Sequence, residues 1–330
     1  MDAYVHDAVL DMHMARDELL RALDDVNPED WDRYVPYGER TLHDVVAHLA
    51  GADTAWALAA QGLLQGESEQ RAPLTPEEAK AVRERAIERG RAASPEELIE
   101  EMGRRRKLLL ALFDLLEPRH LALRLPSYGG EHDAVRERIW LGYHDRLHAA
   151  DIRRALRSSW HPQRLTFLPE LAGAVARLAP SETLYVIYSV DPAYWEKPSR
   201  VPEWTHRNLL AHIATGDWVL QTHLRHLLKH GRAAAWPDVA AGNAERVRER
   251  WLTPWERLVD EYLSMRHETL RLLSQLKSKH LRQPITLSWE PAERREADVQ
   301  RYLDDFWRHD AQHREQLRPA MRYLTARGGR

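Results

Sequence analysis

The sequence contains no cysteine among its 330 residues. This absence excludes a disulfide framework, a cysteine nucleophile and every zinc or iron–sulfur site that needs a thiolate ligand. Any metal ion that the chain binds must therefore be held by histidine and carboxylate side chains. The chain has 18 histidines, so imidazole is its abundant metal ligand of intermediate softness.

Neither sign of charge dominates the sequence. Its 48 lysines and arginines nearly balance its 51 aspartates and glutamates, which gives a formal net charge of −3. A surface of mixed sign lacks the basic patch with which proteins bind polyanions. We therefore expect no nucleic-acid partner.

Long hydrophobic runs are also missing. No apolar stretch approaches the roughly 18 residues of a membrane span, and the first residues show neither the basic nor the apolar region of a signal peptide. We expect no membrane association and a cytoplasmic location.

Apolar residues recur at helical spacing, and convincing alternating strands are absent. Leu184–Tyr188 is the best strand candidate, but it fits a buried helical turn equally well. The length suggests two domains, each large enough to bury its own core. The sequence predicts an all-α protein of two tandem four-helix bundles. The expected long helices are 2–24, 41–62, 94–117 and 131–157 in the first half, and 167–189, 204–230, 254–277 and 291–325 in the second.

The two halves repeat one another. Asn27–Trp31 is echoed by Asp191–Trp195, and Thr41–Leu49 is echoed by Thr205–Ile213 at the same offset. Self-similarity at a fixed offset indicates a duplicated unit.

The segment between the halves has the composition of a linker. Ser158–Pro162 combines serine, aromatic and proline residues, so we predict domains at 1–158 and 163–330. Within the first half, the polar stretch from Glu67 to Ala93 contains the capping sequence Thr75–Glu78. This stretch is expected to hold one short helix.

Histidines occur at matching places in the two halves. Tyr143–His148 places His144 and His148 four residues apart, on one face of a helix. The same spacing recurs near the C-terminus, and a third histidine precedes each pair. The two sets are His48, His144 and His148, and His212, His309 and His313. A single histidine on an apolar face is often a core residue, but recurrence of the whole set favours metal binding.

Three neutral nitrogen ligands would leave a coordination position open to water or another ligand, which is the composition of a catalytic site. Zinc, nickel, iron(II) and manganese all accept such ligands, so the metal's identity stays open. The ion could lower the pKa of bound water or deprotonate a bound thiol.

Polar residues near each triad are candidates for orienting an imidazole or touching a bound cofactor. Asp151 and Gln316 lie three residues beyond the last histidine of each pair, on the same stripe of the helix. Asp44 and Asn208 lie one turn before the first histidine, where the start of a helix favours such residues in any case.

Other neighbours of the histidines are expected to play smaller roles. Gly51 and Gly216 should leave room over the metal because they have no side chain. Asp145 and Asp310 directly follow a ligand and project about 100° away from it, so they should be poor direct ligands. The run Arg104–Lys107 is interpreted as a solvated helix face.

A further row of histidines, His223, His226 and His230, follows helical spacing in the second half. No histidines stand at the corresponding positions of the first half. We therefore interpret this row as a polar helix face, with a second, adventitious metal site as the weaker alternative.

Several motifs resemble those of a known group. Pro36–Thr41 leads into Ala47–Leu49, and Trp204–Thr205 leads into Ala211–Ile213. Together with the His-x-x-x-His pair of each half, they resemble the DinB-like superfamily, which includes mycothiol-dependent maleylpyruvate isomerases and bacillithiol transferases. The resemblance covers essentially the whole chain as two tandem copies.

The resemblance implies a four-helix bundle that holds a divalent metal on three histidines, matched here by the two triads. Characterised relatives use a low-molecular-weight thiol as cosubstrate, and many members have no assigned reaction. The tandem arrangement could replace a homodimer, so a monomer acting as a pseudo-dimer and a homodimer both remain open.

Two functions compete. The first is an enzyme whose metal activates a thiol or water for transfer, isomerisation or hydrolysis on a small molecule; its catalytic residues are unknown. The second is a non-catalytic metal- or ligand-binding stress-response protein. A purely structural bundle with incidental histidines is a third possibility. Three neutral ligands would leave the ion cationic and open, which favours the first.

Overall fold

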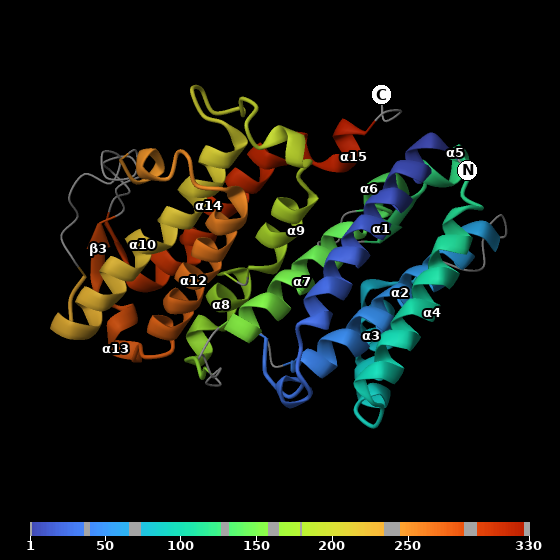
Figure 1. Cartoon of the computed structure of the whole chain (residues 1–330). Helices are drawn as coiled ribbons and strands as arrows, with labels where there is room; N and C mark the ends of the chain where they lie inside the picture. The colour runs from blue at the N-terminus through green and yellow to red at the C-terminus, as the bar shows by residue number, and fades with distance from the viewer. Residues whose placement is uncertain are drawn as a thin grey trace. The chain divides into compact units, whose positions relative to one another are not determined.

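The computed structural model describes residues 2–35, 40–65, 74–126, 132–157, 165–178, 180–233, 245–286 and 296–326. The chain divides into two compact units, one of Met1–Pro162 with Arg322–Arg330 and one of Gln163–Met321 (Figure 1). Both units are helical, and the only named strands in these residues form two short antiparallel pairs. The predicted all-α fold class is confirmed.

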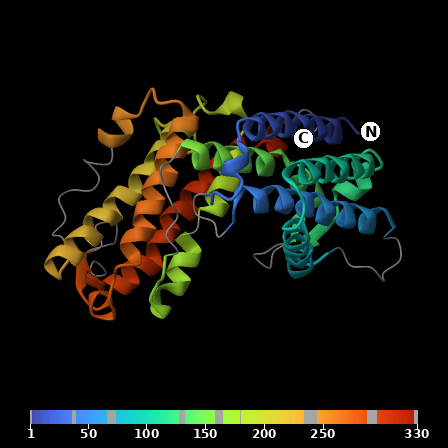
Figure 2. The ribbon, with the colours of Figure 1, turned by 60° about the horizontal axis from the view of Figure 1, so that its bottom comes forward.

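The first unit contains the four predicted long helices and the predicted short one. Their bounds are α1 Ala3–Asp24, α2 Leu42–Gln65, α3 Pro76–Gly90, α4 Pro95–Phe113 and α7 Gly142–Arg157. Helix α2 packs against α3 and α4, and α1 packs against α7 (Figure 2). The unit also holds η1 Pro28–Asp30, α5 Pro118–Leu121, β1 Arg124–Pro126, β2 His132–Ala134, α6 Val135–Arg138 and, from the C-terminal end, α15 Arg322–Thr325. That the long helices are arranged as a four-helix bundle remains a prediction.

The second unit repeats this plan with a divided first helix. Its helices are η2 Pro169–Leu171, α8 Ala172–Leu178, α9 Ser181–Ser189, η3 Pro192–Tyr194, α10 His206–His230, α12 Trp255–Leu273, α13 Ser278–Leu281, α14 Val299–Leu317 and η5 Arg318–Ala320, with strands β3 Pro284–Thr286 and β4 Glu296–Asp298. Helix α14 packs against α8, α9 and α10, and α10 packs against α12.

Three predicted helices are wrong in extent. The continuous helix expected at 167–189 is broken before Pro180, whose ring cannot continue a helix. The helix expected from 131 is interrupted, since β2 is followed by the short helix α6 and α7 begins only at Gly142. The helix expected from 291 begins at Val299, because the preceding described residues pair in β4.

Capping sequences explain where the helices begin. Thr75 and Ser94 each accept a hydrogen bond from the backbone N–H three residues on, and the glutamate there accepts one from the N–H of the capping residue. Thr205 forms the same reciprocal cap with Asn208. Such caps satisfy N–H groups that have no partner in the first turn. The predicted start at 41 is confirmed, since Thr41 Oγ1 accepts from the Asp44 N–H at 3.1 Å.

Backbone hydrogen bonds confirm the repeat register. Leu42 N–H donates to Arg33 O, and its counterpart His206 N–H, 164 residues on, donates to Lys197 O. The isolated bridges Tyr34–Thr41 and Pro198–Thr205 keep the same offset. The two segments that lead into α2 and α10 therefore share one backbone course.

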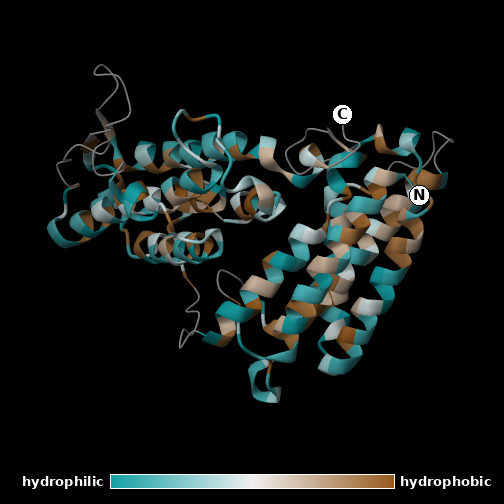
Figure 3. Ribbon diagram, turned by 45° about the horizontal axis from the view of Figure 1, so that its top comes forward, coloured by the Kyte–Doolittle hydropathy of each residue, from teal (hydrophilic) through white to brown (hydrophobic). Residues whose placement is uncertain are grey.

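Each unit has a hydrophobic core built from the inner faces of its helices. Figure 3 shows hydrophobic residues interleaved with hydrophilic ones along them, as amphipathic helices require. The cores include Leu19, Val45, Met102 and Ile152 in the first unit and Leu171, Leu224, Leu273 and Leu303 in the second. No helix within the described residues has the length and apolar character to cross a membrane.

Candidate metal centres

The first predicted triad comes together from two helices. His48 lies on α2, and His144 and His148 lie one turn apart on α7. The Nε2 atom of His144 is 3.2 Å from Nε2 of His48 and 3.3 Å from Nε2 of His148. One ring nitrogen of each residue falls within a cluster 4.8 Å across, so the group could hold a metal ion.

The second predicted triad has the same construction. His212 lies on α10, and His309 and His313 lie on α14. Nε2 of His309 is 2.8 Å from Nε2 of His212, and the His212 and His313 ring centroids are 4.5 Å apart. One ring nitrogen of each of these three residues lies within 4.8 Å of the other two. Both units therefore place an imidazole cluster at the same point of the fold.

The spacing of the nitrogens fits a common ligand ion. Two nitrogens about 2.05 Å from one ion lie about 3.3 Å apart at a tetrahedral angle and about 2.9 Å apart at a right angle. The observed separations of 2.8–3.3 Å agree with these values. Burial lowers the pKa of His48 and His144 well below 6.5, and it lowers the pKa of His313 to about 4. These three imidazoles are thus neutral near pH 7, as metal ligation requires.

Asp151 and Gln316 each touch the last histidine of their triad. Asp151 Oδ2 is 3.3 Å from His148 Nδ1, without the alignment of a hydrogen bond, and Arg154 holds the other carboxylate oxygen at 3.2 Å. Gln316 Oε1 is 2.6 Å from His313 Nδ1. An amide oxygen only accepts, so His313 donates from Nδ1 and keeps the Nε2 lone pair for a ligand.

Asp44 and Asn208 form capping hydrogen bonds at the starts of their helices. The Asp44 carboxylate accepts from the Thr41 N–H at 3.3 Å, and Asn208 Oδ1 accepts from the Thr205 N–H at 2.9 Å. Their acceptor atoms therefore stabilise the first turns of α2 and α10.

The expectation that the two glycines leave room over the metal is wrong. A Cβ atom on Gly51 would lie 2.7 Å from the Ala86 Cβ and 2.9 Å from the Arg83 Cα, so α3 fills that space. A Cβ atom on Gly216 would lie 3.1 Å from Cε1 of His309. The glycines permit a close helix contact in one unit and the seating of a triad imidazole in the other.

Buried ion pairs lie behind both triads, and the sequence interpretation missed them. Arg106 donates to Asp53 at 2.9 Å and to Asp145 at 3.2 Å, and Arg16 bridges the same two carboxylates. Asp145 thus points away from the cluster, as predicted. The interpretation of Arg104–Lys107 as a solvated face is wrong for Arg106, which is buried.

The second unit forms the same cluster with one arginine. Arg266 contacts Asp217 at 2.9 Å and Asp310 at 2.6 Å, and it donates to the Leu178 carbonyl at 2.7 Å. Burial opposes ionisation of Asp310, but Arg266 beside it holds the pKa of that carboxyl below its ordinary value. Asp53 and Asp217 share the repeat offset of 164 residues, and this recurrence is the sequence signal that could have identified them.

The row His223, His226 and His230 does not form a group that could hold a metal ion. Within the described residues, the two triads are the groups of three or more ligand residues that could hold an ion. His223 is buried, with its ring centroid 5.5 Å from that of Tyr302, and the His226 ring contacts His230. The row is a helix face, partly buried and partly exposed.

His223 should make the stability of the second unit depend on pH. Burial lowers its pKa to about 4, with a further contribution from His226. Unfolded histidine titrates near 6.5, so the unfolded chain binds a proton that the folded chain lacks between these values. The free energy of unfolding should fall by up to about 3 kcal/mol as pH drops from 6.5 to 4. In denaturation experiments across this pH range, the free energy of unfolding of His223→Phe should depend less on pH than that of wild type. The variant His6→Gln, changed at an exposed position, should follow wild type. An equal pH dependence in His223→Phe and wild type would contradict the role given to His223.

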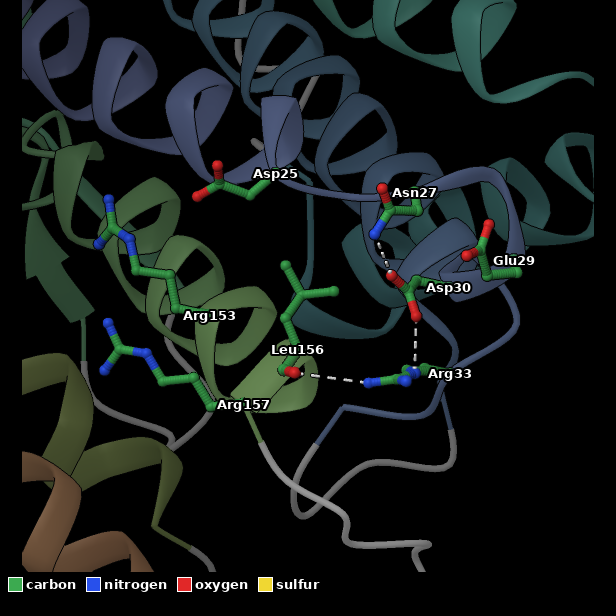
Figure 4. A pocket seen from close by; sticks show the side chains of 8 residues that line it. All are labelled: Asp25, Asn27, Glu29, Asp30, Arg33, Arg153, Leu156 and Arg157. Atoms are coloured by element: carbon green, nitrogen blue, oxygen red, sulfur yellow. Dashed lines mark hydrogen bonds and ion pairs between the residues drawn. The ribbon is translucent and has the colours of Figure 1, made fainter.

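The first unit also contains a surface cavity away from its triad. It measures about 510 Å³ and is lined by Asp25, Asn27, Glu29, Asp30, Arg33, Arg153, Leu156 and Arg157 (Figure 4). Arg33 pairs with Asp30 at 2.8 Å and donates to the Ala155 carbonyl near the end of α7. These contacts cap a helix end, which accounts for the polar lining.

Two family models match the chain in tandem. Residues 12–153 match the mycothiol maleylpyruvate isomerase N-terminal domain, and residues 176–317 match the DinB superfamily. Each match contains all three histidines of its triad. No curated protein and no solved structure gives a match. Fold and sites define a helical protein with a three-histidine cluster in each repeated unit. The chain belongs to the DinB-like superfamily as a tandem member.

Proposed function

We propose that each triad binds one divalent metal ion through its three imidazoles and that the chain is a metal-dependent enzyme. When bound, the ion would activate a low-molecular-weight thiol or water for transfer, isomerisation or hydrolysis on a small molecule. The observation that carries this proposal is the convergence of three neutral nitrogens with no carboxylate among them, twice in one chain. Such a set leaves an ion positively charged and open to a further ligand.

The burial pattern supports access by a small molecule. In both triads two histidines are buried and the first member of the His-x-x-x-His pair, His144 or His309, is partly exposed. A ligand would therefore approach from the side of these two residues. Asp151 and Gln316 would act as positioning residues that fix the last imidazole of each triad, that of His148 or His313.

The proposal is tested by loading the purified chain with zinc, nickel, iron(II) or manganese in turn. Each form is assayed for turnover of a small electrophile with and without a low-molecular-weight thiol, and for ester hydrolysis. Activity that requires metal and disappears with chelator would support the enzyme. Metal binding without turnover of any thiol or ester would favour the alternative, a non-catalytic metal- or ligand-binding stress-response protein.

We expect saturation at two metal ions per chain, with unequal affinities, because Asp151 supports one triad and Gln316 the other. Asp151→Asn should weaken the first centre by about 10-fold and leave the second unchanged, and Gln316→Leu should do the reverse. Calorimetric titration resolves the two steps. A stoichiometry near one after saturation with several ions would contradict the expectation.

A cytoplasmic location and a small-molecule substrate complete the proposal. A monomer acting as a pseudo-dimer and a homodimer both agree with two centres per chain. Light scattering of the purified chain distinguishes these two states.

A further inference from the structure

The two units differ at one equivalent position beside their triads. Val35 N–H donates to the Arg40 carbonyl, and Ser199 N–H donates to the Trp204 carbonyl at the same repeat offset. Both residues come directly before the capping threonine of the helix that carries the first histidine, eight residues before His48 or His212. One backbone course therefore carries an arginine before the first triad and a tryptophan before the second.

Trp204 lies directly against the second triad. Its ring centroid is 5.1 Å from that of His212, with an angle of 62° between the planes. The side chain is only partly buried, so part of the indole surface is open to a ligand. An aromatic face at this place favours apolar and aromatic groups.

Arg40 holds the equivalent position in the first unit. Its side chain is 32% exposed and contacts Glu84 of α3 at 3.2 Å. The same helix packs on Gly51, one turn beyond His48. Burial is the main cause of the lowered pKa of His48, and the positive charges of Arg40 and Arg83 add to it after the two neighbouring histidines. An exposed pair such as Arg40–Glu84 is weak, so an anionic ligand could replace Glu84 at low cost.

We infer that the residue before the capping threonine sets which ligand each centre accepts. The first centre, with Arg40, takes a ligand that carries an anionic group. The second centre, with Trp204, takes one that carries an apolar or aromatic group. This inference rests on the proposed function, and it makes the tandem chain a protein with two different specificities.

The test uses the full chain with one centre disabled. His309→Ala/His313→Ala leaves the first centre, and His144→Ala/His148→Ala leaves the second. Each variant is loaded with Co²⁺ and titrated with 3-mercaptopropionate or with benzyl mercaptan. A thiol that binds the ion does so as the thiolate, releases its proton to solvent and produces a sulfur-to-cobalt charge-transfer band. The band gives a Kd for each thiol without any turnover.

The first centre should favour 3-mercaptopropionate and the second benzyl mercaptan. Arg40→Trp in the first background and Trp204→Arg in the second should each shift the ratio of the two Kd values by about three- to tenfold toward the other thiol. Arg40→Lys and Trp204→Phe, which keep the charge and the aromatic ring, should leave each preference in place.

Thermal melting of each variant shows whether the swaps leave the fold intact. Cobalt and thiol binding with swap ratios changed by less than twofold would overturn the specificity inference and leave the proposed function standing. Absence of cobalt binding in both backgrounds would overturn both.

Discussion

Replacing Arg266 with methionine should lower the free energy of unfolding of the second unit by about 3–5 kcal/mol. The guanidinium is 1% exposed and is the shared partner of Asp217 and Asp310. Methionine fills similar volume but leaves two carboxylates buried without their counter-ion. Breaking a buried pair from one side is costly because the remaining charge keeps its desolvation penalty.

Arg271→Met is the matched control. Arg271 lies on the same helix, is 45% exposed, and pairs with Glu268 at 2.6 Å. An exposed pair contributes about 1 kcal/mol or less, so this variant should remain close to wild type. Chemical denaturation of the full chain, followed by circular dichroism and tryptophan fluorescence, measures both. Equal losses for the two variants would show that the buried cluster is not a major source of stability.

His148→Ala should abolish metal binding by the first centre, with a loss of affinity beyond about 100-fold, since groups that only orient a ligand are already worth 10- to 100-fold. Metal content after gel filtration should fall from two ions per chain to one. The fold should survive with a destabilisation of about 1–3 kcal/mol. Each unit buries a hydrophobic core of its own, so we expect folding not to depend on an ion.

His13→Ala, at an exposed position of α1, controls for the loss of an imidazole and should change neither metal content nor Tm. Wild type treated with a chelator should melt only slightly below the metal-loaded protein. A His148→Ala chain that is unfolded at room temperature, together with unfolding of wild type by chelator, would show that the ion is structural.

The sequence determined the residues of both candidate centres. Two imidazoles four residues apart must share a face of a helix, and this local rule holds wherever the helix is placed. The third histidine of each triad was identified by recurrence, since His48 and His212 hold the same place in a repeated motif. Helix starts were predictable for a similar reason, because a cap such as Thr75 or Ser94 acts on its own first turn.

Helix breaks were less well predicted. Pro180 divides the first helix of the second unit, α7 begins only after β2 and the short helix α6, and α14 begins only after β4. The spacing of apolar residues continues across such breaks, so periodicity alone predicts one continuous helix where the structure has two segments. The strand pairs join residues that are separated along the chain, and no local pattern specifies which partner is chosen.

Only the tertiary structure decided the roles of residues whose partners lie far away in the chain. Arg106 looks like its neighbours Arg104 and Arg105 in the sequence, but it alone points inward to carboxylates of two other helices. Gly51 was expected to open space, and α3 occupies that space. The difference between Arg40 and Trp204 gained meaning once the Trp204 ring was placed against His212. Local preferences depend on a few consecutive residues, whereas burial and charge pairing depend on which helices pack together, and this is why the second kind of information required the fold.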